Sequence, residues 1–458
     1  MFDKNIYIQR RKLLKNYLKT GIILLPGNSN SPMCCQDNCY PFIQDSIFSY
    51  FFGINEPNFV GVIDVDNDKD YIFAKDFTLD DIIWMGPQKL FKDLVEEVGV
   101  YNFIDIDNLK NFLTNINKKI HYVNPYRDDI KLLLANILNI NPFDIAKFSS
   151  LELTKSIIKL RSIKSKEEIS EIEKAVNITR KMHLEAMTVA KAGMKEYEVT
   201  AAVEAICKKY NAYPSFHTIC TINGEILHNH SQNNILKNGD LLLLDCGAKS
   251  ESGYCGDMTS VFPISGTFTK EQTTFYNILI NMFETAEKEI KPYITYKEVH
   301  LKVSKILLEE LKKLNLVKGE INDLIENGIY GLFMPHGLGH MLGLDVHDME
   351  NLGEDLVGYD ETCQRSNLMG LKSLRLAKKL EPGFVFTIEP GIYFIPELIK
   401  KWKSENKFIE YLNYNEIEKL SGKIGMRYEG NYVITENGSK RLGEPMPRTI
   451  DEIETLLK

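Results

Sequence analysis

The sequence predicts an α/β protein built from two domains. Its 458 residues exceed the usual size of one domain, so two hydrophobic cores are expected. Up to about residue 150, short helical stretches alternate with short strand-like stretches, and a long amphipathic helix then begins after Ser165. We therefore expect a smaller α/β domain over residues 1–158 and a larger domain over residues 159–458.

The first domain is expected to begin with a helix over residues 10–17. Strands should follow at residues 21–25, 59–65 and 71–74, where short apolar runs are bounded by turn residues. This alternation is typical of an α/β domain.

The second domain should open with a long helix. Ser165 and Glu168 form the pattern of a capping box, and apolar residues recur at helical spacing until Gly193. Strands are predicted at residues 241–244, 384–388 and 432–435. Polar groups at the ends of these strands would be held rigidly.

The composition argues against several classes of partner. The net charge of −8 gives no electrostatic reason to expect nucleic acid or an anionic membrane surface. The first residues do not read as a signal peptide, and the apolar run at residues 21–26 is too short to span a membrane. We expect a cytoplasmic protein that acts on a small or neutral substrate.

The eight cysteines lack the spacing of a disulfide framework, which agrees with a reducing compartment. Cys34, Cys35 and Cys39 stand close together, and they could be read as a metal site. No second cysteine pair or nearby histidine completes such a site, so free thiols in a loop are favoured and the role of the group stays open.

Two aspartates are expected to meet at one end of a hairpin. Asp245 ends a run of four leucines, and Asp257 follows twelve positions later, across a turn that contains Gly253. A hairpin folding back at this glycine brings both carboxylates to the same end of adjacent strands, where a bound cation would offset their repulsion. Taken alone, this pair would be read more readily as two acids at exposed strand ends than as a metal site.

Three histidines lie close together further along the chain. His336 and His340 are four residues apart, and His347 follows. A zinc-protease helix is unlikely here, because position 337 is glycine where that motif has its glutamate, and Gly337 and Gly339 oppose a stable helix.

Two glutamates complete a candidate ligand set. Glu389 and Glu429 each end or interrupt an apolar segment, where an unpaired charge is costly to bury. Four carboxylates and one histidine suit a hard or borderline cation such as manganese, and their charge exceeds what one divalent ion needs. Two ions about 3.5–4 Å apart would balance it and would lower the pKa of a shared water to about 7, which supplies hydroxide as the nucleophile.

The ordered motifs of the second domain resemble the metallopeptidase family that includes prolidase, aminopeptidase P and methionine aminopeptidase. This family has the pita-bread fold. The motifs are Asp245 with Asp257, Pro335-His336-Gly337-Leu338-Gly339-His340, Asp345-Val346-His347-Asp348, Ile388-Glu389-Pro390-Gly391 and Arg427-x-Glu429.

The first domain resembles the creatinase-like amino-terminal domain of the proline-specific members. The matching segments are Phe42-Ile43-Gln44-Asp45-Ser46, Phe51-Phe52-Gly53-Ile54-Asn55-Glu56-Pro57 and Trp84-Met85-Gly86. The resemblance therefore spans nearly the whole chain, and it implies a smaller α/β domain followed by a pita-bread catalytic domain.

The resemblance also implies a role for each metal ligand. Asp245 would chelate one metal, Asp257 and Glu429 would bridge both, and His340 with Glu389 would complete the other. Glu389 would in addition move a proton. Manganese is the expected metal, with zinc or cobalt as alternatives.

Further residues are implied as substrate contacts. His336 and His347 would hydrogen-bond the scissile carbonyl and assist the leaving nitrogen of proline, and His228 would close over the substrate. Arg427 would orient Glu429, and Arg375 would hold the far end of the substrate.

The implied reaction is hydrolysis of the Xaa-Pro bond at the amino terminus of peptides. The spacing from His228 to Asp245 favours aminopeptidase P, which accepts longer peptides. Arg375 and the long loop before it instead resemble prolidase, which takes Xaa-Pro dipeptides. A catalytically inactive binding module is a distant alternative, because all five ligands are present.

The resemblance also implies a homo-oligomer, dimer or tetramer, in which Trp84 approaches a neighbouring subunit. Trp84 could instead pack within its own domain.

Overall fold

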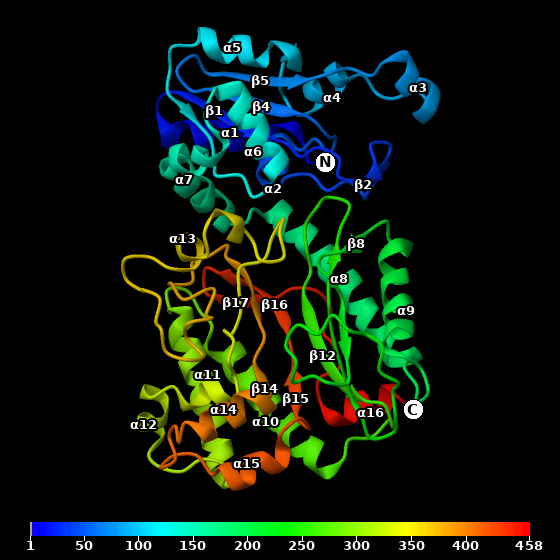
Figure 1. Cartoon of the computed structure of the whole chain (residues 1–458), viewed down its shortest axis with the longest axis vertical. Helices are drawn as coiled ribbons and strands as arrows, with labels where there is room; N and C mark the ends of the chain where they lie inside the picture. The colour runs from blue at the N-terminus through cyan, green and yellow to red at the C-terminus, as the bar shows by residue number, and fades with distance from the viewer. Residues whose placement is uncertain (1) are drawn as a thin grey trace. The chain divides into compact units, whose positions relative to one another are not determined.

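The computed structural model describes residues 2–458, which form two compact units (Figure 1). The first unit ends at Arg161 and the second begins at Ser162, within helix α7 (Leu151–Ser162). The boundary predicted after residue 158 falls in the same helix. Each unit has its own core, as expected for two domains.

The first unit is built on a mixed five-stranded sheet. Its strand order is β6 (Asn102–Asp105), β5 (Lys69–Ala74), β4 (Val60–Asp64), β1 (Ile22–Pro26) and β7 (Ile120–His121). Strands β1, β4 and β5 pair antiparallel, while β7 and β6 add parallel partners at the two edges. The three strands predicted in this part of the chain are confirmed.

In the part of the first unit that the structure describes, six α-helices precede α7, and the predicted first helix is confirmed as α1. The helices are α1 (Lys4–Leu18), α2 (Ser46–Phe52), α3 (Leu79–Met85), α4 (Phe91–Glu97), α5 (Leu109–Asn115) and α6 (Asp128–Leu138), with 3₁₀ turns η1 (Ile106–Asn108), η2 (Pro142–Asp144) and η3 (Ala146–Phe148). Buried side chains of α5 and α6, among them Leu113 and Leu134, pack with Ile22 and Val62 of the sheet. A short hairpin of β2 (Pro32–Cys35) and β3 (Asn38–Cys39) carries the three clustered cysteines.

The second unit places strands between pairs of long helices (Figure 1). The pairs are α8 (Lys166–Val189) with α9 (Glu196–Lys209), and α10 (Lys270–Glu289) with α11 (Tyr296–Lys313). The predicted capping box is confirmed, because the Ser165 hydroxyl accepts from the Glu168 backbone and the Glu168 carboxylate accepts from the Ser165 N–H at 3.0 Å.

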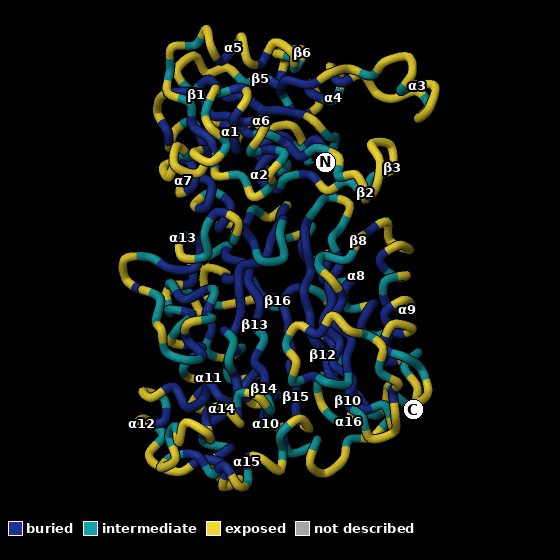
Figure 2. Tube along the Cα trace, in the orientation of Figure 1, coloured by how far each residue is buried: buried dark blue, intermediate teal, exposed yellow. Residues whose placement is uncertain are grey.

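Most strands between these helices are almost entirely buried, while β8 and β17 are partly exposed (Figure 2). They form one sheet of β12 (Met258–Pro263), β10 (Leu241–Cys246) and β9 (Ile219–Thr221), a second of β13 (Val385–Ile388), β16 (Gly430–Thr435) and β17 (Gly438–Arg441), and the pairs β14 (Gly391–Tyr393) with β15 (Gly425–Arg427) and β8 (Tyr213–Pro214) with β11 (Ala248–Lys249). Strand β12 contacts β15 and β16, which brings the predicted acid-bearing strand ends together.

The remaining elements of the second unit are short. They are α12 (Ile321–Glu326), α13 (Glu354–Gly358), α14 (Pro396–Ser404), α15 (Tyr414–Leu420), α16 (Ile450–Leu456), η4 (Ile329–Leu332) and η5 (Glu350–Leu352). None of the helices in the described part of the chain has both the length and the apolar character that a membrane crossing requires.

Candidate metal centre

All ten side chains singled out from the sequence line one cavity of about 410 Å³ in the second unit. These residues come from seven separate parts of the chain, and the fold brings all of them to the lining of this cavity. They are His228, Asp245, Asp257, His336, His340, His347, Arg375, Glu389, Arg427 and Glu429.

The two aspartates lie at one end of the predicted hairpin. Strands β10 and β12 pair antiparallel with Asp245 opposite Thr259, and Asp257 directly precedes β12. The chain turns at Gly253, whose φ of 87° suits glycine, and the Gly253 N–H donates to the Ser250 carbonyl at 2.8 Å. The sequence-based expectation for this pair is confirmed.

His340 is held in an extended segment and not in a helix. Its backbone N–H donates to the Thr387 hydroxyl at 3.1 Å, and the Thr387 N–H donates to the His340 carbonyl at 2.9 Å. Gly339 permits this approach, because a Cβ at that position would lie 2.0 Å from the Thr387 carbonyl oxygen. The rejection of a zinc-protease helix is therefore correct.

The two glutamates stand at strand ends that face the aspartates. Glu389 follows β13, and its N–H donates to the Leu338 carbonyl at 2.8 Å. Glu429 lies between β15 and β16, and its N–H donates to the Thr259 carbonyl at 3.0 Å. Backbone hydrogen bonds thus fix both side chains relative to β12 and to the histidine segment.

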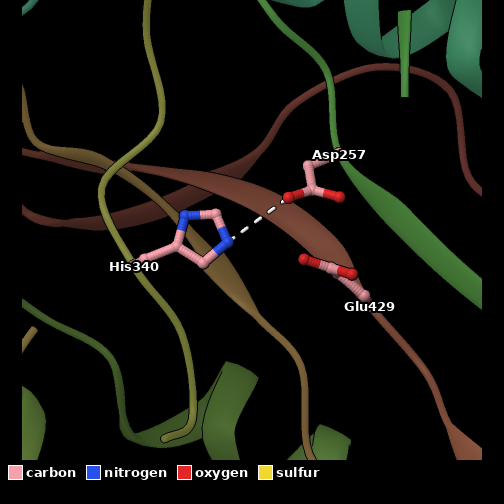
Figure 3. Close-up of side chains that lie close together, drawn as sticks. All are labelled: Asp257, His340 and Glu429. Carbon is pink, nitrogen blue, oxygen red and sulfur yellow. Dashed lines mark ion pairs between the residues drawn. The ribbon is translucent and has the colours of Figure 1, made fainter. Parts of the chain in front are cut away.

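Three of the five predicted ligands form a close group (Figure 3). Asp257, His340 and Glu429 each offer a ligand atom, and these atoms all lie within 4.8 Å of one another. The His340 Nε2 lies 3.3 Å from Asp257 Oδ2 and 3.4 Å from Glu389 Oε1, so the fourth ligand borders the same point. Asp245 lies on the other strand of the hairpin, opposite Thr259, and pairs with Arg427.

The carboxylates are buried with oxygens that find no donor. Asp245 Oδ1, Asp257 Oδ1 and Glu429 Oε1 accept no hydrogen bond within residues 2–458. A buried carboxylate oxygen without a partner is costly, and a divalent cation would offset that cost. The donor set of four carboxylates and one imidazole thus fits hard or borderline divalent ions.

The close approach of these buried carboxylates also shifts pKa values within the site. Burial and the charges of Asp257 and Glu389 raise the pKa of Glu429 well above its usual value. Burial, opposed by Arg427 and reinforced by Asp257, raises the pKa of Asp245 to about 7. Burial alone would lower the pKa of His340, but the carboxylates of Asp257 and Glu389 raise it to about 9. The site without cations therefore holds protons that a metal would displace.

Arg427 ties several of these groups together. Its Nη2 pairs with Asp245, its Nε donates to the Thr259 hydroxyl at 3.1 Å, and its Nη1 donates to the Tyr393 hydroxyl at 2.9 Å. The Thr259 hydroxyl in turn donates to Glu429 Oε2 at 2.7 Å. Arg427 was expected to orient Glu429; it contacts Asp245 directly and reaches Glu429 only through Thr259.

His336 has protein partners on both ring nitrogens. Its Nδ1 lies 2.8 Å from the Gly337 carbonyl, which requires a proton on Nδ1, and its Nε2 lies 3.0 Å from the Tyr393 hydroxyl. Burial and the charge of Arg427 lower the pKa of His336 to about 3. This imidazole is neutral and is held by the Gly337 carbonyl and the Tyr393 hydroxyl, so its nitrogens are less free to contact substrate than the resemblance implies.

His347 and His228 are the more open histidines of the predicted set. The His347 ring meets the His340 ring edge to face at 4.2 Å, and its Nδ1 lies 3.3 Å from Glu350 Oε2. Burial lowers the pKa of both His347 and His228, and nearby cations lower it further. Both are neutral at physiological pH and can exchange hydrogen bonds with a ligand.

Other residues in and around the cavity were not anticipated. Tyr393 links His336 with Arg427, and Thr259 links Arg427 with Glu429. His217 and His230 also line the cavity, with ring centroids 4.9 Å apart. Tyr393 follows Glu389 by four residues in an apolar segment that reads as core, and His217 stands alone in the sequence, so no recognisable pattern marks either residue.

Comparison with known proteins agrees with this geometry. Residues 170–436 match the model of Metallopeptidase family M24, and residues 7–123 match the model of the Aminopeptidase P, N-terminal domain. The human protein named Xaa-Pro dipeptidase is 31% identical over 450 residues, covering 95% of this chain and 88% of that protein. The Escherichia coli (strain K12) protein named Xaa-Pro aminopeptidase is 30% identical over 466 residues, covering 98% and 96%.

A solved structure matches along the full length of the chain. The low-pH form of aminopeptidase P from E. coli superposes with a TM-score of 0.83 at 28% identity, covering 100% of this chain and 98% of that one. This match and the two family models confirm the expected fold class, an aminopeptidase P-type amino-terminal domain followed by a pita-bread domain.

Proposed function

Since the chain belongs to metallopeptidase family M24, we propose that it is a metal-dependent aminopeptidase that hydrolyses the Xaa-Pro bond at the amino terminus of peptides. The observation that carries the proposal is the convergence of Asp257, His340 and Glu429 on one buried point, beside carboxylate oxygens that accept no hydrogen bond within residues 2–458. Relatives named Xaa-Pro aminopeptidase and Xaa-Pro dipeptidase, each matching over most of its length, support the substrate class.

We propose that five side chains hold two divalent ions: Asp245, Asp257, His340, Glu389 and Glu429. Asp257 and Glu429 would be shared between the ions, and manganese is the first candidate, with zinc and cobalt as alternatives. Bound divalent ions would activate a water molecule and polarise the scissile carbonyl. The anionic, thiol-free character of the donor set supports this choice.

The protein's own residues would then move protons and position the peptide. Burial raises the pKa of Glu389, which suits a carboxyl that must accept a proton and release it again. His347 and His228, both neutral, would exchange hydrogen bonds with the peptide around the scissile bond. His336 would act mainly by holding Tyr393, and Arg427 by holding Asp245.

Prolidase activity, the cleavage of Xaa-Pro dipeptides, is the second candidate. Arg375 supports it, because this arginine lines the cavity and a guanidinium can hold the free carboxylate of a dipeptide with two hydrogen bonds. To separate the candidates, kcat/KM is measured for an Xaa-Pro dipeptide and for an Xaa-Pro-Xaa-Xaa tetrapeptide under the same manganese conditions. Efficient cleavage of the tetrapeptide supports the aminopeptidase; cleavage of the dipeptide alone makes prolidase the correct assignment.

We further propose a homo-oligomer, dimer or tetramer, and a cytoplasmic location. Every residue of helix α3 is at least partly exposed, and Trp84 is 84% exposed beside Ile83 at 68%, which supports contact with a second copy of the chain. The eight cysteines are all free, which supports a reducing compartment. Light scattering tests the assembly: a fully active monomer at all concentrations contradicts it.

A further inference from the structure

One wall of the cavity carries a cation that is already paired. Arg375 lines the cavity, and its Nη1 contacts two carboxylates, Glu350 Oε2 at 2.5 Å and Glu354 Oε2 at 3.4 Å. Both contacts use the same nitrogen, so Nη2 and Nε are the groups left for a ligand. The guanidinium is therefore correctly placed for a substrate carboxylate, but its charge is already balanced.

The surrounding network leaves no unbalanced positive charge at Arg375. Glu354 also pairs with Arg365, and Arg365 Nε lies 2.6 Å from Asp355. Arg375 thus faces two carboxylates, Glu350 and Glu354, whereas the exposed Asp355 contacts Arg365 and not Arg375. A third carboxylate brought to Arg375 would meet these two resident negative charges.

Glu350 is firmly ionised. Burial would raise its pKa, but the hydrogen bond from His347, together with the charge and hydrogen bond of Arg375, lowers the pKa below its usual value. Its Oε2 is shared between His347 Nδ1 at 3.3 Å and Arg375, while its Oε1 is buried and accepts no hydrogen bond within residues 2–458. The charge of Oε1 therefore stays available to repel an approaching anion.

We propose that Glu350 and Glu354 determine the length of the accepted substrate by neutralising Arg375. A dipeptide ending in proline presents a free carboxylate beside the scissile bond, and this group would compete with two resident carboxylates. A longer peptide presents an uncharged amide at the same place and meets no such repulsion. This inference rests on the proposed function and deepens it: the preferred substrates are Xaa-Pro peptides that continue beyond the proline.

The test compares two substrates that differ only in this charge, an Xaa-Pro dipeptide and its carboxy-terminal amide. The measured quantity is the ratio of kcat/KM for the acid to kcat/KM for the amide, with manganese-loaded enzyme. Because both substrates need His347 equally, any effect of Glu350 on that histidine cancels in the ratio. The wild-type ratio should lie well below one.

Removing either resident charge should raise this ratio. A like charge several ångströms away in a partly screened site changes affinity by about fivefold to tenfold, so Glu350→Gln and Glu354→Gln should each raise the ratio by that factor. The matched control is Asp355→Asn, which removes a charge from the same segment without a contact to Arg375, and it should leave the ratio within about twofold. In the double variant Glu350→Gln/Arg375→Met the gain should disappear, because it depends on the freed guanidinium.

Three results would overturn the inference. The first is a ratio unchanged within about twofold in both glutamine variants, and the second is an equal gain in Asp355→Asn, which would make the effect one of general charge. Both leave the proposed function intact. The third, a wild-type enzyme that cleaves neither these substrates nor the tetrapeptide, contradicts the proposed function itself and the inference with it.

Discussion

Replacing Thr259 by valine removes one hydroxyl beside the predicted metal ligands while keeping the shape of the side chain. This hydroxyl donates to Glu429 Oε2 at 2.7 Å and accepts from Arg427 Nε at 3.1 Å, and Thr259 is 1% exposed. The variant therefore leaves Glu429 and Arg427 each without one buried hydrogen bond. We expect the fold to persist and the affinity for metal to fall.

The expected magnitude follows from the charge on both partners. A hydrogen bond to a charged group contributes about 1.5–3 kcal/mol, and about 1.4 kcal/mol corresponds to a factor of ten. If losing one such hydrogen bond destabilises only the metal-bound state, the Kd for manganese rises by about 10-fold to 100-fold. This range agrees with that for removing groups that orient metal ligands.

The assay titrates metal-free protein with manganese. Calorimetry measures manganese binding, and peptide hydrolysis measures turnover at each manganese concentration. Ser260→Ala is the matched control, because Ser260 follows Thr259 on β12 and is buried to a similar extent. Its hydroxyl lies 2.8 Å from His183 Nδ1, which is not a predicted metal ligand. The control should bind manganese like the wild type, and Thr259→Val should regain turnover at saturating manganese. A Kd for Thr259→Val within twofold of the wild type would refute the reasoning.

Three further predictions follow from the site. Replacing Asp257 or Glu429 by alanine should abolish both turnover and manganese binding in equilibrium dialysis, because these residues would be shared by the two ions; retained activity would remove them from the ligand set. His347→Ala should keep its manganese and lose about 10²-fold or more in kcat, as expected for a proton-transfer or carbonyl-polarising group, and equal metal loss would make it a ligand. In metal-free protein the pKa of Asp245 is about 7 and that of His340 about 9, and both lie above the values of these groups in an unfolded chain. The protonated forms of these two groups therefore stabilise the metal-free fold fully at low pH, and this stabilisation is lost as the pH rises through 7 and 9. Manganese replaces these protons, so its gain in Tm, measured by scanning fluorimetry, should be larger at about pH 8.5 than at about pH 6, and equal gains would contradict the pKa directions.

The sequence predicted the ligand-bearing strand ends because each one carries a strong local signal. A run of four leucines ends at Asp245, and Gly253 marks the turn, so the position of Asp257 beside it could be inferred from hairpin geometry alone. In the same way, Gly337 and Gly339 excluded a helix around His340, and Gly339 proved to be required by the close approach of Thr387.

The partners of these ligands could not be predicted from local patterns. Thr259 and Tyr393 lie on strands whose sequences read as ordinary core; the packing of β12 against β15 brings Thr259 to Arg427, and the pairing of β14 with β15 brings Tyr393 there. Tertiary contacts, not spacing, also decide that Arg427 pairs with Asp245 and that Glu350 pairs with Arg375. The assigned roles of the individual site residues therefore remain proposals that the variants above address.

The domain boundary shows the same limit. The sequence placed it after residue 158, yet α7 continues as one helix to Ser162, and no glycine, proline or change in composition marks the point where the two units separate. We retain 1–158 and 159–458 as the proposed functional domains. Limited proteolysis between the units would test this division.

The most direct test of the central claim is reconstitution of metal-free enzyme with manganese while the release of the first residue from an Xaa-Pro-Xaa-Xaa peptide is followed. We predict no release without metal and activity that rises to a plateau as up to two ions bind per chain. A fully active enzyme that holds one zinc ion and gains nothing from manganese would contradict the proposed dinuclear centre.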